Sequence, residues 1–104
     1  MPYYKLEDVR ISARNNKIEY RSRKVKRDID NLGYDFMDVI NCLMSLIESD
    51  FHKTYYYENG DIDDAYRIDY PSPIDNDEND SLYIKFCLIN NYLMIDLASF
   101  HQNY

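Results

Sequence analysis

The feature that most constrains the fold is a change in the spacing of apolar residues within residues 32–67. In its first half the apolar residues recur every three or four positions, which is the pattern of a helix with one buried face. Asp35 can cap the start of this helix, and Gly33 can end a preceding helix in the left-handed conformation. The predicted buried face carries Phe36, Val39, Ile40, Leu43, Met44 and Ile47.

The second half of this stretch has the pattern of strands. Tyrosines and other residues that favour strands fill 52–57 and 62–70. Asn59-Gly60 lies between the two runs and is the strongest short signal for a β-hairpin. The chain is therefore expected to combine helices with an antiparallel hairpin.

A second hairpin is predicted over 81–89 and 92–100, which flank an Asn-Asn turn. A two-residue turn fixes the register, and side chains alternate along each strand, so each strand has one apolar and one polar face. We expect the apolar face to pack on the helices and the polar face to be rich in tyrosine. The register predicts two polar-face pairs, Tyr83 with Ala98 and Lys85 with Asp96.

The residues before this stretch predict two more helices, 6–13 and 22–32, with a short extended piece at 17–20. The whole chain, residues 1–104, is then a single α+β domain. We expect three N-terminal helices packed on one face of an antiparallel sheet.

Charge is unevenly distributed along the chain. Nine of the twelve Lys and Arg residues lie within 5–27, against three acidic residues. The rest of the chain carries three basic and sixteen acidic residues, several of them in a proline-interrupted loop at 71–80, and the net charge is −7. A spatially separate basic segment can attract a polyanion. The alternative is that 5–27 forms solvated, charged helix surfaces.

Several classes of protein are excluded by the sequence. No apolar run approaches the roughly 20 residues of a membrane span, and no signal peptide opens the chain. Cys42 and Cys87 lie in apolar contexts, and neither they nor His52 and His101 have the spacing of a zinc site. We therefore expect reduced core cysteines, no metal cofactor and a cytoplasmic protein.

Four short blocks carry a family resemblance. They read LG-x-DF at 32–36, L-x-ESDF-HK at 46–53, D-x-YR at 64–67 and YIK at 83–85. Together with the order of the helix and hairpins, they resemble the MqsR family of bacterial toxins. The resemblance implies a RelE-like fold and a metal-independent endoribonuclease, an mRNA interferase that cuts single-stranded mRNA. It also implies a cognate protein antitoxin, similar to MqsA, as partner.

The resemblance also points to candidate site residues. Lys53 and Tyr83 match two residues of the family active site, a lysine after the DF pair and a tyrosine in the fourth strand. Asp63 stands where the family has a glutamine. Ala98 stands where the family has a lysine, so that lysine is missing, and His101 follows three positions later. We expect cleavage to be slower than is usual in the family.

Cleavage of RNA without a metal needs three chemical roles. A base removes the proton of the 2′-hydroxyl, a cation stabilises the phosphorane, and an acid protonates the leaving 5′-oxygen. We expect Lys53 to be the cation, while Tyr83 could donate a hydrogen bond or proton to the phosphate and Asp63 could be the base. Arg67 and Lys85 could hold phosphates, and 5–27 is expected to supply most of the attraction to RNA.

Structural roles compete with each of these assignments. Lys53 can be an ordinary surface lysine, Tyr83 one of twelve tyrosines used in packing, and Asp63 a solvated charge. Lys85 can form an ion pair with Asp96 across the second hairpin.

The predicted first hairpin also contains a conflict. A two-residue turn places Lys53 opposite Tyr66 and turns Asp63 to the other side of the sheet. Either a bulge intervenes or Asp63 is not catalytic. With the missing lysine and the net charge of −7, this leaves a second functional class, a catalytically weak module of the same fold that binds a protein through its acidic sheet and loop.

Overall fold

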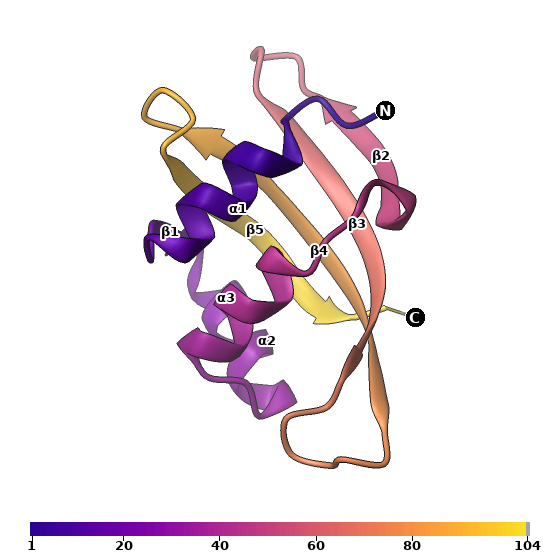
Figure 1. The fold of residues 1–104 in the computed structure, drawn as a ribbon. Helices are drawn as coiled ribbons and strands as arrows, with labels where there is room; N and C mark the ends of the chain where they lie inside the picture. Colours follow the sequence, from indigo (N-terminus) through magenta and orange to yellow (C-terminus); the bar gives the residue numbers. More distant parts are fainter. Residues whose placement is uncertain (104) are drawn as a thin grey trace.

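The computed structural model describes residues 1–103, which form a layer of helices on one five-stranded sheet (Figure 1). The helices of this range are α1 (Leu6–Arg14), α2 (Arg23–Leu32), α3 (Phe36–Met44) and the short 3-10 helix η1 (Glu48–Asp50). The strands are β1 (Ile18–Tyr20), β2 (Phe51–Tyr56), β3 (Ile62–Pro71), β4 (Asn79–Ile89) and β5 (Met94–Gln102).

The sheet is mixed, with the strand order β1-β5-β4-β3-β2. β1 runs parallel to β5, whereas the other neighbours are antiparallel. The prediction of an α+β fold is confirmed. The expectation of three N-terminal helices on an antiparallel sheet is wrong in two respects, because β1 lies between α1 and α2 and because it pairs in parallel. A parallel partner far along the chain leaves no turn signal in the sequence.

Local chemistry sets the ends of α3. The Asp35 carboxylate accepts a hydrogen bond from the Asp38 backbone N–H (2.9 Å), and the Asp38 carboxylate accepts one from the Asp35 N–H (2.8 Å). Gly33 ends α2 with a φ of 80°, as predicted, because glycine adopts this conformation without steric cost. α3 ends at Met44, so Ile47, predicted on its buried face, lies beyond the helix and is 53% exposed.

The helices cover one face of the sheet, and the core lies between the two layers (Figure 1). The largest fully buried side chains include Tyr66, Phe86 and Phe100 of β3, β4 and β5. The rings of Tyr66 and Phe86 stack with their centroids 5.7 Å apart. Burial of each such side chain contributes about 1.5–3 kcal/mol. Packing therefore fixes this face of the sheet, and polar side chains occupy the other.

The turn of the first hairpin differs from the expected one. The Tyr57 N–H donates to the Asp61 carbonyl (2.9 Å), which closes a loop of the three residues between them. Gly60 takes a φ of 93°. A three-residue loop with a left-handed glycine is a common alternative to the two-residue Asn-Gly turn.

This turn shifts the register of β2 by one residue. Lys53 pairs with Ala65, and the expected pairing with Tyr66 is wrong. A shift of one residue reverses the face of a whole strand. Lys53 and Asp63 therefore project from the same face, and the expectation that they point to opposite sides is also wrong. A bulge before Lys53 lets Phe51 keep its contact with the ring of Tyr66, 5.7 Å between centroids.

In the second hairpin, the register between β4 and β5 next to the turn differs from the predicted register by two residues. Its loop is closed by the pair of Ile89 with Met94, and three consecutive loop residues have positive φ, namely Asn90 (53°), Asn91 (60°) and Tyr92 (66°). An even shift leaves every side chain on its predicted face. This holds for β4 and for β5 as far as Leu97. The bulge at Ala98 adds one more residue to the shift, so Phe100 lies in the core and His101 projects from the polar face, against the predicted alternation.

The pairs across this hairpin are nevertheless different. The observed pairs are Tyr83 with His101 and Lys85 with Ser99. The expected partners, Ala98 and Asp96, are both wrong. Ala98 has no strand partner in the register, because a bulge in β5 inserts it between two pairs.

Candidate functional site

Arg67, Tyr83 and His101 form one row across the polar face of the sheet. Arg67 of β3 pairs with Tyr83 of β4, which pairs with His101 of β5. The rings of Tyr83 and His101 stack with their centroids 5.3 Å apart and their planes at 22°. The row places a guanidinium, a phenol and an imidazole side by side.

Lys53, Ala65 and Lys85 form the next row. Ala65 is completely buried although it faces away from the core. The Nζ atoms of Lys53 and Lys85 lie 4.5 and 5.1 Å from the centre of the Tyr55 ring. A cation is attracted to the face of an aromatic ring. The ring of Tyr55 is therefore close to both lysine ammonium groups.

Tyr55 also connects the two rows. The Tyr83 hydroxyl donates a hydrogen bond to the Tyr55 hydroxyl (3.1 Å). Burial, and next this hydrogen bond, raise the pKa of Tyr83 well above its ordinary value. Tyr83 therefore keeps its proton at neutral pH. Because one phenol donates to the other, one O–H of the pair remains free to donate to an anion.

Uncompensated positive charge distinguishes this part of the face. The chain after position 27 has only three basic residues, Lys53, Arg67 and Lys85, and all three lie in these rows. In the described part of the chain none of them forms an ion pair. The pKa of the adjoining His52 is lowered by burial and then by Arg67 and Lys53. We call this group the cationic cluster, which comprises Lys53, Tyr55, Arg67, Tyr83, Lys85 and His101.

Asp63 lies on the same face but belongs to a different set of contacts. Arg21 donates two hydrogen bonds to its carboxylate (2.9 and 2.8 Å), and the Tyr57 hydroxyl donates a third (2.9 Å). Arg21 also donates to Asp96 (2.9 Å). Asp63 is only 1% exposed, so the expectation of a solvated charge is wrong. We call Arg21, Tyr57, Asp63, Cys87 and Asp96 the Arg21 network.

These contacts determine the ionisation of the network. Burial raises the pKa of Asp63, but the hydrogen bonds from Arg21 and Tyr57 outweigh burial and hold that pKa below its ordinary value. Burial and the bond to Asp63 raise the pKa of Tyr57 to about 12. A carboxylate whose oxygens are already hydrogen-bonded is a weak proton acceptor. The geometry favours a structural role for Asp63.

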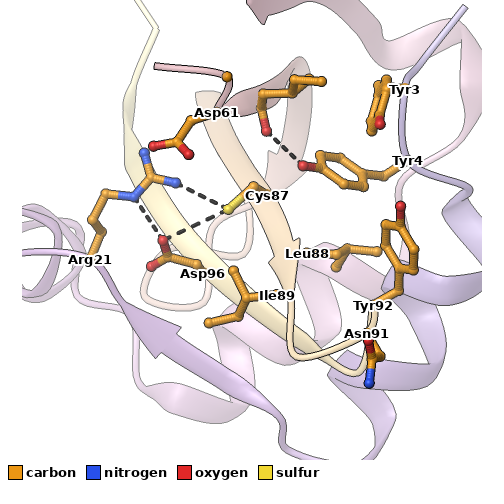
Figure 2. A pocket seen from close by; sticks show the side chains of 12 residues that line it. Tyr3, Tyr4, Arg21, Asp61, Cys87, Leu88, Ile89, Asn91, Tyr92 and Asp96 are labelled. Carbon is orange, nitrogen blue, oxygen red and sulfur yellow. Dashed lines mark hydrogen bonds and ion pairs between the residues drawn. The ribbon is translucent and has the colours of Figure 1, made fainter. Parts of the chain in front are cut away.

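A cavity of about 530 Å³ lies at the end of the sheet occupied by the Arg21 network (Figure 2). Figure 2 shows Arg21 bonded to Asp96 and to Cys87, with Tyr4 across the cavity. The Cys87 sulfur lies 3.3 Å from an Arg21 nitrogen. Both cysteines are free, but only Cys42 is in the core as predicted, whereas Cys87 is half-buried on the polar face. The charged groups of this cavity already have partners.

The basic segment 5–27 lies mainly on the helices. Its cations on α2 are exposed, and two of them form ion pairs within the helix, Lys24 with Asp28 and Lys26 with Asp30 (2.6 Å each). Arg21 is the member that reaches the polar face of the sheet. The segment is therefore separate from the cationic cluster.

Two further findings concern residues 1–103. No group of three or more His, Cys, Asp or Glu side chains in this range is arranged to hold a metal ion. None of its helices combines the length and the apolar character needed to cross a membrane.

The structure brings four of the predicted site residues together, namely Lys53, Arg67, Tyr83 and Lys85. It does not join Asp63 to them, and it leaves Lys85 without the expected ion pair to Asp96, which binds Arg21 instead. The sequence reasoning missed Tyr55. Its signal is position, since it lies two residues after Lys53 in the same strand and therefore on the same face.

Over residues 1–102 the chain matches the protein family described as "Motility quorum-sensing regulator, toxin of MqsA". No curated protein matches the chain. The family match covers essentially the whole chain, including every residue of the cationic cluster.

Proposed function

The chain belongs to the MqsR family, the toxins of MqsA, and from this membership we propose that it is a metal-independent endoribonuclease that cleaves single-stranded mRNA. The resemblance read from the sequence is confirmed, and the family makes the chain a toxin of a toxin–antitoxin system. An MqsA-like antitoxin is its proposed partner.

One observation carries the proposal. The acidic part of the chain has three basic residues against sixteen acidic ones, and all three gather within two adjacent rows of the sheet. Like charges repel, so three unpaired cations gathered on one face do not serve stability. They form a binding site for an anion, and phosphates of a nucleic acid backbone fit a guanidinium and two ammonium groups.

The same site supplies groups for phosphodiester cleavage. When a 2′-hydroxyl attacks the adjacent phosphorus, negative charge develops on the phosphoryl oxygens. Lys53 and Lys85 flank the Tyr55 ring and can stabilise this charge, and the Tyr55–Tyr83 pair has a free O–H for a phosphoryl oxygen. Arg67 lies in the row of Tyr83 and can hold a neighbouring phosphate. Attack by the 2′-oxygen leaves a 2′,3′-cyclic phosphate and a free 5′-hydroxyl.

A second candidate function is a catalytically weak module that binds a protein. It is favoured by the net charge of −7 and by exposed acidic residues at the tip of the first hairpin, Glu58 and Asp61. It predicts binding to a basic partner and no cleavage of RNA.

Replacement of Lys53 tests the proposal. Expression of the chain without an antitoxin should arrest growth, and Lys53→Ala should relieve the arrest while the protein stays folded, because this exposed lysine has no ion pair to lose. Glu19→Ala is the control, since Glu19 is also an exposed strand residue without an ion pair among the described residues and lies outside the cationic cluster. Purified proteins should differ in the same order in cleavage of a short RNA. A folded Lys53→Ala variant that remains fully toxic would refute the assignment.

A further inference from the structure

We propose that His101 is a catalytic residue of this site, the base that takes the proton of the attacking 2′-hydroxyl. The inference rests on the proposed endoribonuclease function and adds the group that function lacks. The cationic cluster has three cations and two phenols. Asp63, the predicted base, is instead hydrogen-bonded within the Arg21 network. Without a base the hydroxyl cannot be activated.

Position is the first reason. His101 pairs directly with Tyr83 across β4 and β5, and its ring stacks on the phenol at 5.3 Å. Lys53 approaches the same phenols from β2, on the opposite side of the face. A phosphate held over the Tyr55–Tyr83 pair therefore lies between an imidazole and an ammonium. Base and acid on opposite sides of the phosphorus suit an in-line displacement.

The tautomer is the second reason. The Nδ1 atom of His101 lies 2.9 Å from the carbonyl oxygen of Gln102. A carbonyl can only accept, so Nδ1 carries the hydrogen of this bond, and in the neutral ring the lone pair is on Nε2. The backbone thus fixes the ring with its basic nitrogen available. An imidazole with an unprotonated ring nitrogen can accept a proton, as a general base must.

The step balances without another reactant. Nε2 of His101 takes the 2′-hydroxyl proton as the 2′-oxygen bonds to phosphorus. The bond from phosphorus to the 5′-oxygen then breaks, and the Lys53 ammonium gives a proton to that oxygen. Exchange with water returns a proton to Lys53 and removes one from His101.

Neighbouring charges must be considered in any pH measurement. On this face the titratable and charged groups around His101 include Tyr83 and Lys85 of β4 and Arg67 and Asp69 of β3. Helix α2 packs on the other face of β5, against its apolar side chains.

The test is single-turnover cleavage of a short single-stranded RNA as a function of pH. The wild-type rate should rise with pH through the range in which histidine loses its proton and then level off. His101→Ala should lower the rate on the order of 10²-fold or more and remove that rise. Added imidazole should restore part of the rate. His101→Gln is the matched variant, because it keeps a polar side chain of similar size but cannot take a proton, and it should stay slow.

Two comparisons separate the possible failures. Lys53→Ala should be slow yet keep the histidine rise in its residual activity, and His52→Ala should also keep the rise. The inference is overturned if folded His101→Ala and His101→Gln cleave RNA like the wild type, or if the rise disappears with His52 instead. In those cases the proposed function stands. A wild-type protein that does not cleave RNA at all would overturn both.

Discussion

The two ends of one sheet face use charge in opposite ways. In the Arg21 network every charged group has a partner of opposite charge, since Arg21 contacts both Asp63 and Asp96 within 2.9 Å, and Asp63 is 1% exposed. In the cationic cluster Lys53, Arg67 and Lys85 have no carboxylate partner among the described residues. The two sets lie a few residues apart on the same strands.

The difference separates structural charges from functional ones. Loss of Arg21 would leave the Asp63 carboxylate buried and without its ion pair, which is costly, so the network stabilises the fold. Removing an unpaired exposed cation costs the fold little and removes an interaction with a ligand. The predictions below test this contrast, from the largest expected effect on stability to the smallest.

Asp63→Asn should give the largest loss of stability. An amide cannot accept all three hydrogen bonds that Arg21 and Tyr57 donate to the buried carboxylate, and each lost hydrogen bond to a charged group costs about 1.5–3 kcal/mol. Urea unfolding followed by circular dichroism would measure the free energy. Asp61→Asn, at an exposed position nearby, is the control and should change stability by less than about 0.5 kcal/mol. Equal effects of the two variants would remove the distinction between the two ends of the face.

Ala65→Leu should cost about 1–3 kcal/mol, because Ala65 is completely buried between Lys53 and Lys85 and a larger side chain there must displace its neighbours. A displaced Tyr55 ring should lose its contact with the Tyr83 hydroxyl and move both lysines. RNA cleavage should therefore fall by more than the loss of folded protein explains. Ala65→Ser, which adds one atom, should have smaller effects on both. Full cleavage by a folded Ala65→Leu variant would show that Tyr55 does not organise the cluster.

The acid dependence of stability should come partly from Asp63. Its pKa in the folded protein is held below the unfolded value. The stability contributed by its charge is then complete above about pH 4, the usual pKa of an unfolded aspartate, and is lost as the pH falls through the lower folded pKa. Thermal melts between pH 7 and pH 2 should show a shallower decline for Asp63→Asn than for the wild type. Parallel curves would exclude Asp63 as a source of the decline.

Lys85→Ala should leave stability within about 0.5 kcal/mol of the wild type. Binding to single-stranded RNA should weaken, and the slope of its logarithm against the logarithm of salt concentration should fall by about 0.7. The triple reversal of Arg23, Lys24 and Arg27 to Glu tests the competing expectation that segment 5–27 supplies most of the attraction. A larger loss of slope in the triple variant than in Lys53→Ala and Lys85→Ala combined would support that expectation.

The sequence predicted the helices and strands better than the register in which the strands pair. The caps at Gly33 and Asp35 were correct because they depend on neighbouring residues. The faces of β4, and of β5 as far as Leu97, were also correct, because the register error there was even, whereas beyond the bulge at Ala98 it was odd. The face of β2 was wrong because a three-residue loop shifted it by one. Turn length cannot be read from Asn-Gly alone, and it decides which side chains meet.

The candidate site was predictable only in part for a related reason. Lys53 and Tyr83 come from the family resemblance, and their meeting depends on strand pairs that the sequence did not fix. The partner of Asp63 is Arg21, which reaches it from the far edge of the sheet. No local sequence pattern predicts a contact between residues this far apart in the chain. Tyr55 was not identified as a site residue, because the chain has twelve tyrosines and composition does not distinguish one from another.

The position of β5 in the strand order has a consequence for synthesis. β1 has β5 as its neighbour, and Arg21 and Asp96 are separated by 75 positions in the chain. A ribosome delivers the chain from its N-terminus, so α1, β1 and α2 emerge long before their sheet exists. The row of Arg67, Tyr83 and His101 also needs β5. The proposed nuclease site therefore remains unassembled on the ribosome until β5 has emerged.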